Sequence, residues 1–245
     1  MTIQLQPELE ANSISQMAEN IVKNLLVKFD NKKMFYLLGY SFGLNIALEV
    51  AVLLEKKGLV GVIFCLDTSP ETLRTQLNAI TGNFTDAELQ NALISHIYYL
   101  MTKEKNPKLN EKIIKSETFE EKTKDFIRAV RKHVSYSQEY IRLTLETTYK
   151  SILLAREYEP KHILNSQLVL IKGTTQSNTQ FGADYNLSQF SKKPVKVISI
   201  DCDHANIPMD INIPCIINSM VNRDSVKKQK IINNCEKYFA RNTYS

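Results

Sequence analysis

The segment from Gly39 to Gly43 holds a serine between two glycines, in the pattern G-x-S-x-G with Ser41 at its centre. An apolar run, residues 34–38, precedes the segment, and an uninterrupted helix-forming run, residues 44–54, follows it. A strand, this pattern and a helix in succession are typical of a nucleophile elbow, whose tight turn lifts the serine hydroxyl clear of the backbone. Such a turn favours small residues two positions before and two positions after the serine. Ser41 is therefore predicted to be a nucleophile. The alternative is an ordinary serine in a strand-to-helix turn.

A serine hydroxyl is a poor nucleophile at neutral pH, so the elbow needs a base, and the base needs an orienting carboxylate. His204 is the best candidate for the base, because it follows an apolar strand pattern at residues 195–200. Loops at the carboxyl ends of parallel strands are where active sites collect. The alternative is a surface loop histidine. The other three histidines fall in predicted lid helices or in a linker: His96, His133 and His162.

Asp67 is the best candidate for the acid, because it ends the strand that follows the elbow helix and so reaches the same edge of the sheet. Its alternative role is to cap the turn that comes next. Asp184 is the second choice, since the usual hydrolase acid comes one strand later. Asp201 and Asp203 are too close in sequence to His204 to reach the far nitrogen of its ring easily.

The hydrophobic patterns predict an α/β-hydrolase fold with a mostly parallel sheet and a helical lid insertion. Strand, helix and strand alternate through residues 34–66, strand signals vanish from residue 71 to about 158, and strands return at 167–173 and 195–200. We therefore expect three parts: 1–70, the first part of the hydrolase core; 71–157, the helical lid; and 158–245, the second part of the core.

Further helices are predicted from local signals. Ser13 and Gln16 form a capping-box pattern before a helix over residues 14–29. Gly58 is expected to end the helix that follows the elbow. Within the lid, the lysine-rich stretch 102–124 predicts a loosened chain between helices. The tail over residues 224–239 has the spacing of a basic amphipathic helix.

Composition excludes several classes of protein. The 245 residues carry a net charge of +5 and are 43% hydrophobic, an ordinary globular balance without a dense basic patch for nucleic acid. No apolar run is long enough to span a bilayer, and residues 1–12 show no secretory signal, so we expect a cytoplasmic protein. The cysteines lack the spacing of a metal site and are interpreted as thiols in a reducing compartment, with a catalytic cysteine as a weak alternative: Cys65, Cys202, Cys215 and Cys235.

Taken together, these segments resemble the thioesterase domain at the carboxyl end of animal (type I) fatty acid synthase. Five blocks carry the resemblance: Gly39–Gly43, Phe64–Pro70, Tyr158–Lys161, Gly182–Gln189 and Asp203–His204. The resemblance implies that Ser41 is the nucleophile, His204 the base and Asp67 the acid, with Asp184 in a structural loop. It also implies a substrate: a long-chain fatty acyl thioester, mainly palmitoyl, on the phosphopantetheine arm of an acyl carrier protein domain. No metal or redox cofactor is implied.

The resemblance further implies that the backbone N–H of Phe42 is one oxyanion donor. The family carries a second donor in a His-Pro-x-x-Gly-like loop among several strands upstream of the elbow, and this sequence starts just before the elbow's preceding helix. We therefore expect a fragment of a larger synthase, a truncated protein or an inactive relative. Losing one oxyanion donor costs about 2.7–4 kcal/mol in the transition state.

For the acyl chain, Tyr40, Ile97 and Met101 are candidates to line a groove. The alternative is that Ile97 and Met101 pack the core of the lid. Basic residues near the C-terminus could attract an acidic carrier protein, or could simply form a solvated helix face: Lys227, Lys228 and Lys230. Two other functions stay open, a non-catalytic acyl-binding or carrier-docking module, and an esterase or lipase with the same triad.

Overall fold

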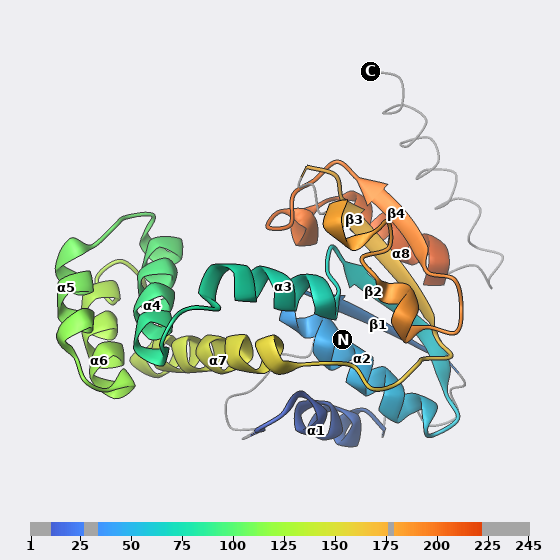
Figure 1. Ribbon diagram of the computed structural model, residues 1–245, viewed down its shortest axis with the longest axis horizontal. Coiled ribbons are helices and arrows are strands. Elements are labelled where there is room, and N and C mark those ends of the chain that lie inside the picture. Colours follow the sequence, from blue (N-terminus) through green and yellow to red (C-terminus); the bar gives the residue numbers. More distant parts are fainter. Residues whose placement is uncertain (1–10, 27–33, 176–178, 222–245) are drawn as a thin grey trace. The chain divides into compact units, whose positions relative to one another are not determined.

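The computed structural model describes residues 11–26, 34–175 and 179–221 (Figure 1). The chain divides into two compact units, which are described separately. A sheet unit comprises residues 18–69 and 160–245, and a helical unit comprises residues 1–17 and 70–159. The helical unit thus takes in the predicted lid, 71–157, and also the N-terminal residues through Met17.

The sheet unit is built on four parallel strands in the order β1-β2-β3-β4. The strands are β1 (Met34–Tyr40), β2 (Val60–Leu66), β3 (Gln167–Gly173) and β4 (Lys196–Ile200). Helix α2 (Phe42–Glu55) connects β1 to β2, so these elements form the predicted strand–helix–strand crossover. A parallel sheet flanked by helices confirms the predicted fold class. Because all strands run the same way, their carboxyl ends share one edge.

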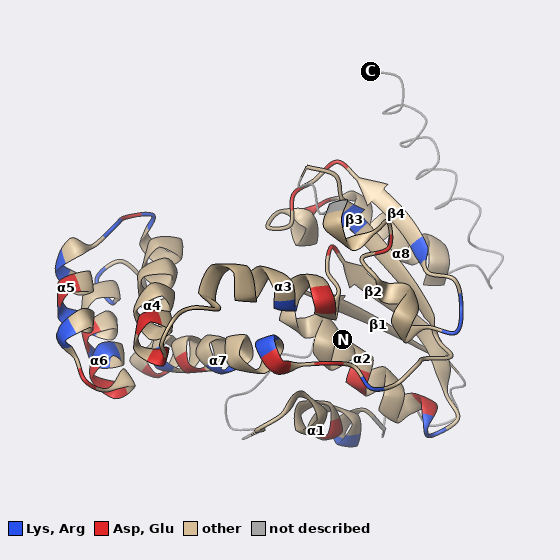
Figure 2. Ribbon diagram, in the orientation of Figure 1, with Lys and Arg blue, Asp and Glu red and all other residues tan. Residues whose placement is uncertain are grey.

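Helices cover both faces of this sheet. The side chain position of Gly39 in β1 faces Leu44 of α2, so α2 lies on that face. On the opposite face, Phe64 of β2 and Ile171 of β3 pack with Ile213 of helix α8 (Asn212–Val221) in one buried cluster. Burial on two faces explains why β2 and β3 are apolar, whereas β1 alternates buried and exposed residues and β4 is mostly exposed. Few charged positions lie on the strands in Figure 2.

Short helical turns occupy the loops that follow the strands. They are the 3₁₀ helices η1 (Thr179–Phe181), η2 (Leu187–Phe190) and η3 (Ile207–Met209). The helix predicted over 14–29 is α1 (Ile14–Leu26) in the described residues, with the N–H of Gln16 donating to Ser13 Oγ. Helix α2 ends three residues before Gly58, which has a left-handed φ of 79° in the turn beyond it. The predicted tail helix, residues 224–239, and Cys235 lie outside the described residues.

The helical unit holds five complete helices among the described residues, besides residues 14–17 at the start of α1. They are α3 (Pro70–Thr81), α4 (Asp86–Thr102), α5 (Pro107–Lys115), α6 (Phe119–Val130) and α7 (Gln138–Glu157). The expectation of a loosened chain over 102–124 is wrong, because α5 and the start of α6 occupy that stretch. Asn106 caps α5, and Thr118 with Glu121 forms a capping box on α6. These caps satisfy the free backbone groups at the helix starts despite the polar composition.

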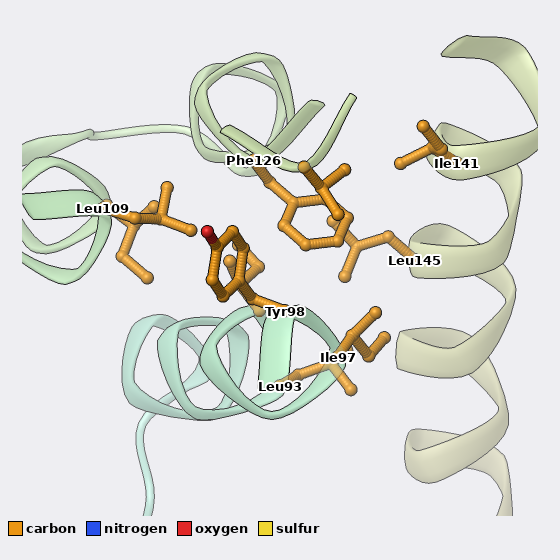
Figure 3. Close-up of a cluster of buried hydrophobic side chains, with 10 residues drawn as sticks. Leu93, Ile97, Tyr98, Leu109, Phe126, Ile141 and Leu145 are labelled. Atoms are coloured by element: carbon orange, nitrogen blue, oxygen red, sulfur yellow. The ribbon is translucent and has the colours of Figure 1, made fainter. Parts of the chain in front are cut away.

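The helical unit has a hydrophobic core of its own (Figure 3). Leu93, Ile97 and Tyr98 of α4 meet Phe126 of α6 and Leu145 of α7 there. Figure 2 marks charged positions along α5 and α6, and one of them, Lys122 of α6, is buried with its Nζ donating to Ala87 O at 3.3 Å. None of the described helices has the length and hydropathy required to cross a bilayer.

Candidate active site

The turn between β1 and α2 has the geometry of a nucleophile elbow. Ser41 lies between the last residue of β1 and the first residue of α2, with φ 50° and ψ −129°. Residues other than glycine rarely adopt this left-handed φ, and such strain is concentrated at functional sites. A Cβ at Gly39 would lie 2.5 Å from Leu44 Cα, whereas a Cβ at Gly43 would meet nothing within 4 Å among the described atoms. The predicted need for a small residue is therefore confirmed at Gly39 and wrong at Gly43.

Asp67 stands directly after β2 and is 5% exposed. Its backbone is also left-handed, with φ 46°, and its N–H donates to Ile171 O on β3 at 2.8 Å. One carboxylate oxygen, Oδ1, accepts from the backbone N–H of Gly173 at 2.9 Å and from the hydroxyl of Tyr185 at 3.0 Å. The second oxygen, Oδ2, is left for another partner.

That partner is His204. Its Nδ1 lies 3.2 Å from Asp67 Oδ2 and 3.2 Å from the Asp67 carbonyl oxygen. The histidine stands on the loop after β4, so two strand ends bring the pair together, as the sequence predicted. The other ring nitrogen, Nε2, is the one left to act on a nucleophile.

Tyr40 holds the imidazole next to the elbow. The rings of Tyr40 and His204 stack with centroids 4.9 Å apart and an interplanar angle of 27°, and the Tyr40 hydroxyl donates to the His204 carbonyl at 2.9 Å. Tyr40 immediately precedes Ser41, so the imidazole of His204 packs against the residue next to the candidate nucleophile. Among the described residues, Ser41 Oγ itself makes no hydrogen bond to the imidazole.

The surroundings of this site favour the neutral form of Tyr40 and the ionised form of Asp203. Burial, followed by the nearby carboxylates of Asp67 and Asp203, raises the pKa of Tyr40, so its phenol keeps the proton that it donates. Hydrogen bonds from Asn206, backbone and side chain, lower the pKa of Asp203. The Asp203 carboxylate therefore stays charged. By accepting hydrogen bonds from the backbone and the side chain of Asn206, it shapes the loop that carries His204.

The backbone N–H of Phe42, the predicted oxyanion donor, belongs to the first residue of α2. The first N–H groups of a helix have no partner within the helix and carry the positive end of its dipole. Its position beside Ser41 matches the donor that such an elbow supplies.

The other acids considered from the sequence have structural partners instead. Asp184 accepts hydrogen bonds from the backbone N–H groups of Asn186 and Ser188, so it shapes the turn before η2. Asp201 accepts from the Thr174 hydroxyl at 3.4 Å. Among the acids considered as partners of His204, the structure pairs Asp67 with it.

Ile97 and Met101, two of the candidate acyl-binding residues, lie in the helical unit. Ile97 is 7% exposed and points into the core between α4 and α7 (Figure 3). Met101 packs against the same cluster. These contacts are the ones expected if Ile97 and Met101 pack the core of the helical unit. Tyr40, the third candidate, contacts His204. Lys227, Lys228 and Lys230 lie outside the described residues.

Sequence reasoning missed two groups of this site, the Gly173 N–H and the Tyr185 hydroxyl. Gly173 ends β3 and Tyr185 is fully buried, with 0% exposure, in the loop before η2. One signal was available, since Tyr185 stands inside the block 182–189 that carries part of the family resemblance. The pattern does not reveal which group the tyrosine contacts.

Known proteins resemble this chain in sequence pattern and in fold. A family model described as "Thioesterase domain" matches residues 2–211. The fold is similar to that of a four-domain nonribosomal peptide synthetase, holo-AB3403 bound to AMP and glycine, with a TM-score of 0.67 and 19% identity over 91% of this chain. It is also similar to the Vlm2 thioesterase domain, with a TM-score of 0.51 and 16% identity over 79% of this chain.

A second structure of the Vlm2 domain, bound with a dodecadepsipeptide, matches with a TM-score of 0.53 and 14% identity over 79% of this chain. The chain spans 17% of the synthetase, and 69% and 68% of the two Vlm2 chains. At these identities the likeness establishes an α/β-hydrolase-like thioesterase fold. The family match covers most of the sequence, and the chain therefore belongs to the thioesterase domain family.

Proposed function

We propose that this protein is a serine thioesterase that hydrolyses an acyl thioester carried by an acyl carrier protein and releases the free acid. The observation that carries the proposal is the Asp67–His204 pair, 3.2 Å apart, with the imidazole of His204 stacked on Tyr40, the residue that precedes Ser41. Nucleophile, base and acid thus come from three strand ends of one sheet edge, the arrangement that activates a serine hydroxyl.

The proposed reaction has two steps. His204 Nε2 takes the proton from Ser41 Oγ as the oxygen attacks the thioester carbonyl, and the thiolate of the carrier leaves with that proton. Asp67 accepts from Nδ1–H and stabilises the imidazolium that forms. The Phe42 N–H stabilises the oxyanion. Water, deprotonated by His204, then hydrolyses the acyl-serine and regenerates the hydroxyl.

For the substrate we propose a long-chain fatty acyl group, such as palmitoyl, on the phosphopantetheine of a fatty acid synthase carrier domain. The support is the resemblance of the sequence to the fatty acid synthase thioesterase, which extends beyond the elbow to the block 182–189. The reaction uses no metal or redox cofactor of the protein. We place it in the cytoplasm, in line with the buried thiol of Cys65 and the carrier-bound substrate.

Labelling with a fluorophosphonate tests the reaction class. Wild-type chain is expected to label at Ser41 and to release thiol from a palmitoyl thioester, and Ser41→Ala is expected to lose both. Ser188→Ala, at an exposed position of η2, is the matched control and should behave like wild type. A folded wild-type protein that neither labels nor hydrolyses thioesters, yet binds a fatty acyl ligand saturably, would instead support the non-catalytic acyl-binding function.

A substrate panel tests the acyl group. Palmitoyl, short-chain acyl and peptidyl thioesters of the same thiol are compared by kcat/KM, together with a palmitoyl oxygen ester. The proposal expects preference for the palmitoyl thioester. Faster turnover of the peptidyl thioester would assign the site to peptide release, and faster turnover of the oxygen ester would assign it to the esterases.

A further inference from the structure

The carboxylate of Asp67 is held asymmetrically. Oδ1 receives two hydrogen bonds, from Gly173 N–H at 2.9 Å and from Tyr185 Oη–H at 3.0 Å, while Oδ2 lies 3.2 Å from His204 Nδ1. A carboxylate is planar, so two donors on one oxygen fix its rotation and thereby the place of the other oxygen. The two donors on Oδ1 therefore fix the position of Oδ2, the oxygen that faces the imidazole of His204.

Tyr185 reaches Asp67 from a strained loop. Its φ is 56°, and the following residue, Asn186, has φ 61°. A bulky residue at positive φ is uncommon and persists only where its surroundings over-determine it. Asp184 supplies part of that constraint, by accepting from the backbone N–H groups of Asn186 and Ser188. Of the five described non-glycine residues with positive φ, four belong to this site or its loop, Ser41, Asp67, Tyr185 and Asn186, and the fifth, Lys103, caps the end of α4.

A cation lies over the tyrosine ring. Lys172 Nζ is 4.8 Å from the centroid of the Tyr185 ring, and Lys172 directly precedes Gly173, the other donor to Oδ1. A cation over an aromatic face is attracted to its electrons and draws density away from the hydroxyl. The end of β3 thus acts on the Asp67 carboxylate in two ways. Gly173 donates its N–H to Oδ1, and Lys172 places its charge over the ring of Tyr185, the other donor to Oδ1.

We propose that Tyr185 is a positioning residue of the triad: its hydroxyl, polarised by Lys172, locks Asp67 Oδ1 and limits the negative charge that Oδ2 presents to His204. This role rests on the proposed function of the triad. It predicts that loss of the hydroxyl leaves more charge on Oδ2, which stabilises the protonated imidazole. It also predicts a less well-fixed base, because the carboxylate can then rotate.

Several groups face the imidazole and must stay constant in a test. Among the described residues these are Asp67 from the end of β2, Tyr40 from the end of β1 and Asp203 from the histidine's own loop. Tyr185→Phe leaves all three in place. Tyr36→Phe is the matched control, since Tyr36 lies on β1 with 36% of its surface exposed.

The experiment titrates His204 by NMR in the full chain labelled with ¹³C-histidine, with the signal assigned through His204→Gln. In Tyr185→Phe the titration midpoint of His204 should move to higher pH, and in Tyr36→Phe it should stay at the wild-type value. With a palmitoyl thioester, kcat per fluorophosphonate-titrated site should fall about threefold to tenfold in Tyr185→Phe at unchanged KM, the effect of one neutral hydrogen bond.

An unchanged His204 titration in folded Tyr185→Phe would overturn the proposal. If Tyr185→Phe does not fold, Lys172→Met provides the test, because it keeps the hydroxyl and removes the cation; its midpoint should move the same way by a smaller amount, and no movement would overturn the proposal. A shifted titration in a protein without thioesterase activity would support the coupling and refute the proposed function, so the two failures are distinguishable.

Discussion

His204 Nδ1 lies 3.2 Å from Asp67 Oδ2, although 137 positions separate the two residues in the sequence. The contact exists because β2 and β4 run parallel on either side of β3, so the loops at their carboxyl ends meet at one edge. At the same edge, the ring of Tyr40 at the end of β1 stacks on the imidazole of His204. Three strand ends therefore define the site.

Asp67→Asn tests the acid directly. The amide cannot stabilise the imidazolium and favours the wrong tautomer of His204, so kcat on a palmitoyl thioester should fall by about 10⁴-fold, the effect of this substitution in a serine triad. Asp201→Asn is the control, since Asp201 is exposed and bonds Thr174 instead. Retention of more than a tenth of the wild-type kcat in Asp67→Asn would remove Asp67 from the triad.

The two elbow glycines should differ sharply on substitution. A Cβ at Gly39 would lie 2.5 Å from Leu44 Cα, which forces β1 and α2 apart, and overpacking of this kind costs about 1–3 kcal/mol in the free energy of unfolding. Gly43→Ala meets no described atom within 4 Å and should raise helix stability by up to about 1 kcal/mol. Urea unfolding and fluorophosphonate labelling of both variants measure this. Equal losses in the two variants would contradict the difference.

The triad candidates could be predicted from sequence because each follows an apolar strand pattern. Ser41, Asp67 and His204 stand at strand ends, and the geometry of a parallel sheet then places their backbones at one edge. The structure pairs Asp67 with His204, as expected. Tyr185 could not be predicted in this way, since it lies in a loop of left-handed residues and short turns that has no periodicity to read.

The expectation of a loosened chain was wrong for a physical reason that composition hides, while an acyl-binding role of Ile97 and Met101 stays a prediction. The polar stretch 102–124 is helical because the caps at Asn106 and Thr118 outweigh its composition. The spacing of Ile97 and Met101 marks an apolar helix face but does not say what covers it, and the structure covers it with helices α6 and α7. Gly58, in contrast, closes α2 as the predicted C′ residue: its φ is 79°, its N–H donates to Glu55 O, and the N–H of Leu59 donates to Leu54 O.

Cys65 should be inert in the folded protein. It is 0% exposed in β2, and burial raises the pKa of its thiol to about 12, so almost no thiolate forms at pH 8. Iodoacetamide at pH 8, followed by mass spectrometry, should modify Cys65 only after unfolding in urea. The partly exposed Cys215 is the internal control and should react in the native state. Native modification of Cys65 at the rate of Cys215 would show that β2 opens readily.

Glu55 should make the stability of the sheet unit depend on pH. At the end of α2 its carboxylate accepts from the backbone N–H groups of Asn165 and Ser166, at 2.9 and 2.7 Å, and from the Asn165 side chain at 2.9 Å. The Ser166 hydroxyl in turn accepts from the Gly61 N–H at 3.0 Å. Glu55 therefore ties the crossover helix to the start of β3 and, through Ser166, to β2.

Burial by itself would raise the pKa of Glu55, but the hydrogen bonds from Asn165 and Ser166 outweigh it and the pKa is lowered. A carboxyl whose folded pKa lies below its unfolded value stabilises the fold above the unfolded value, about 4.3, and loses that contribution as pH falls through the folded pKa. Glu55→Gln should therefore be less stable than wild type at pH 7 by about 1 kcal/mol, after allowance for solvent screening of a partly exposed group.

The measurement is urea unfolding of wild type and Glu55→Gln at pH 7 and near pH 3. The stability gap between them should narrow at the lower pH, because wild-type Glu55 is then protonated as well. Glu19→Gln, on the exposed face of α1, is the matched control and should show no gap at either pH. A gap that stays constant between pH 7 and pH 3 would mean that Glu55 contributes through packing and not through its charge.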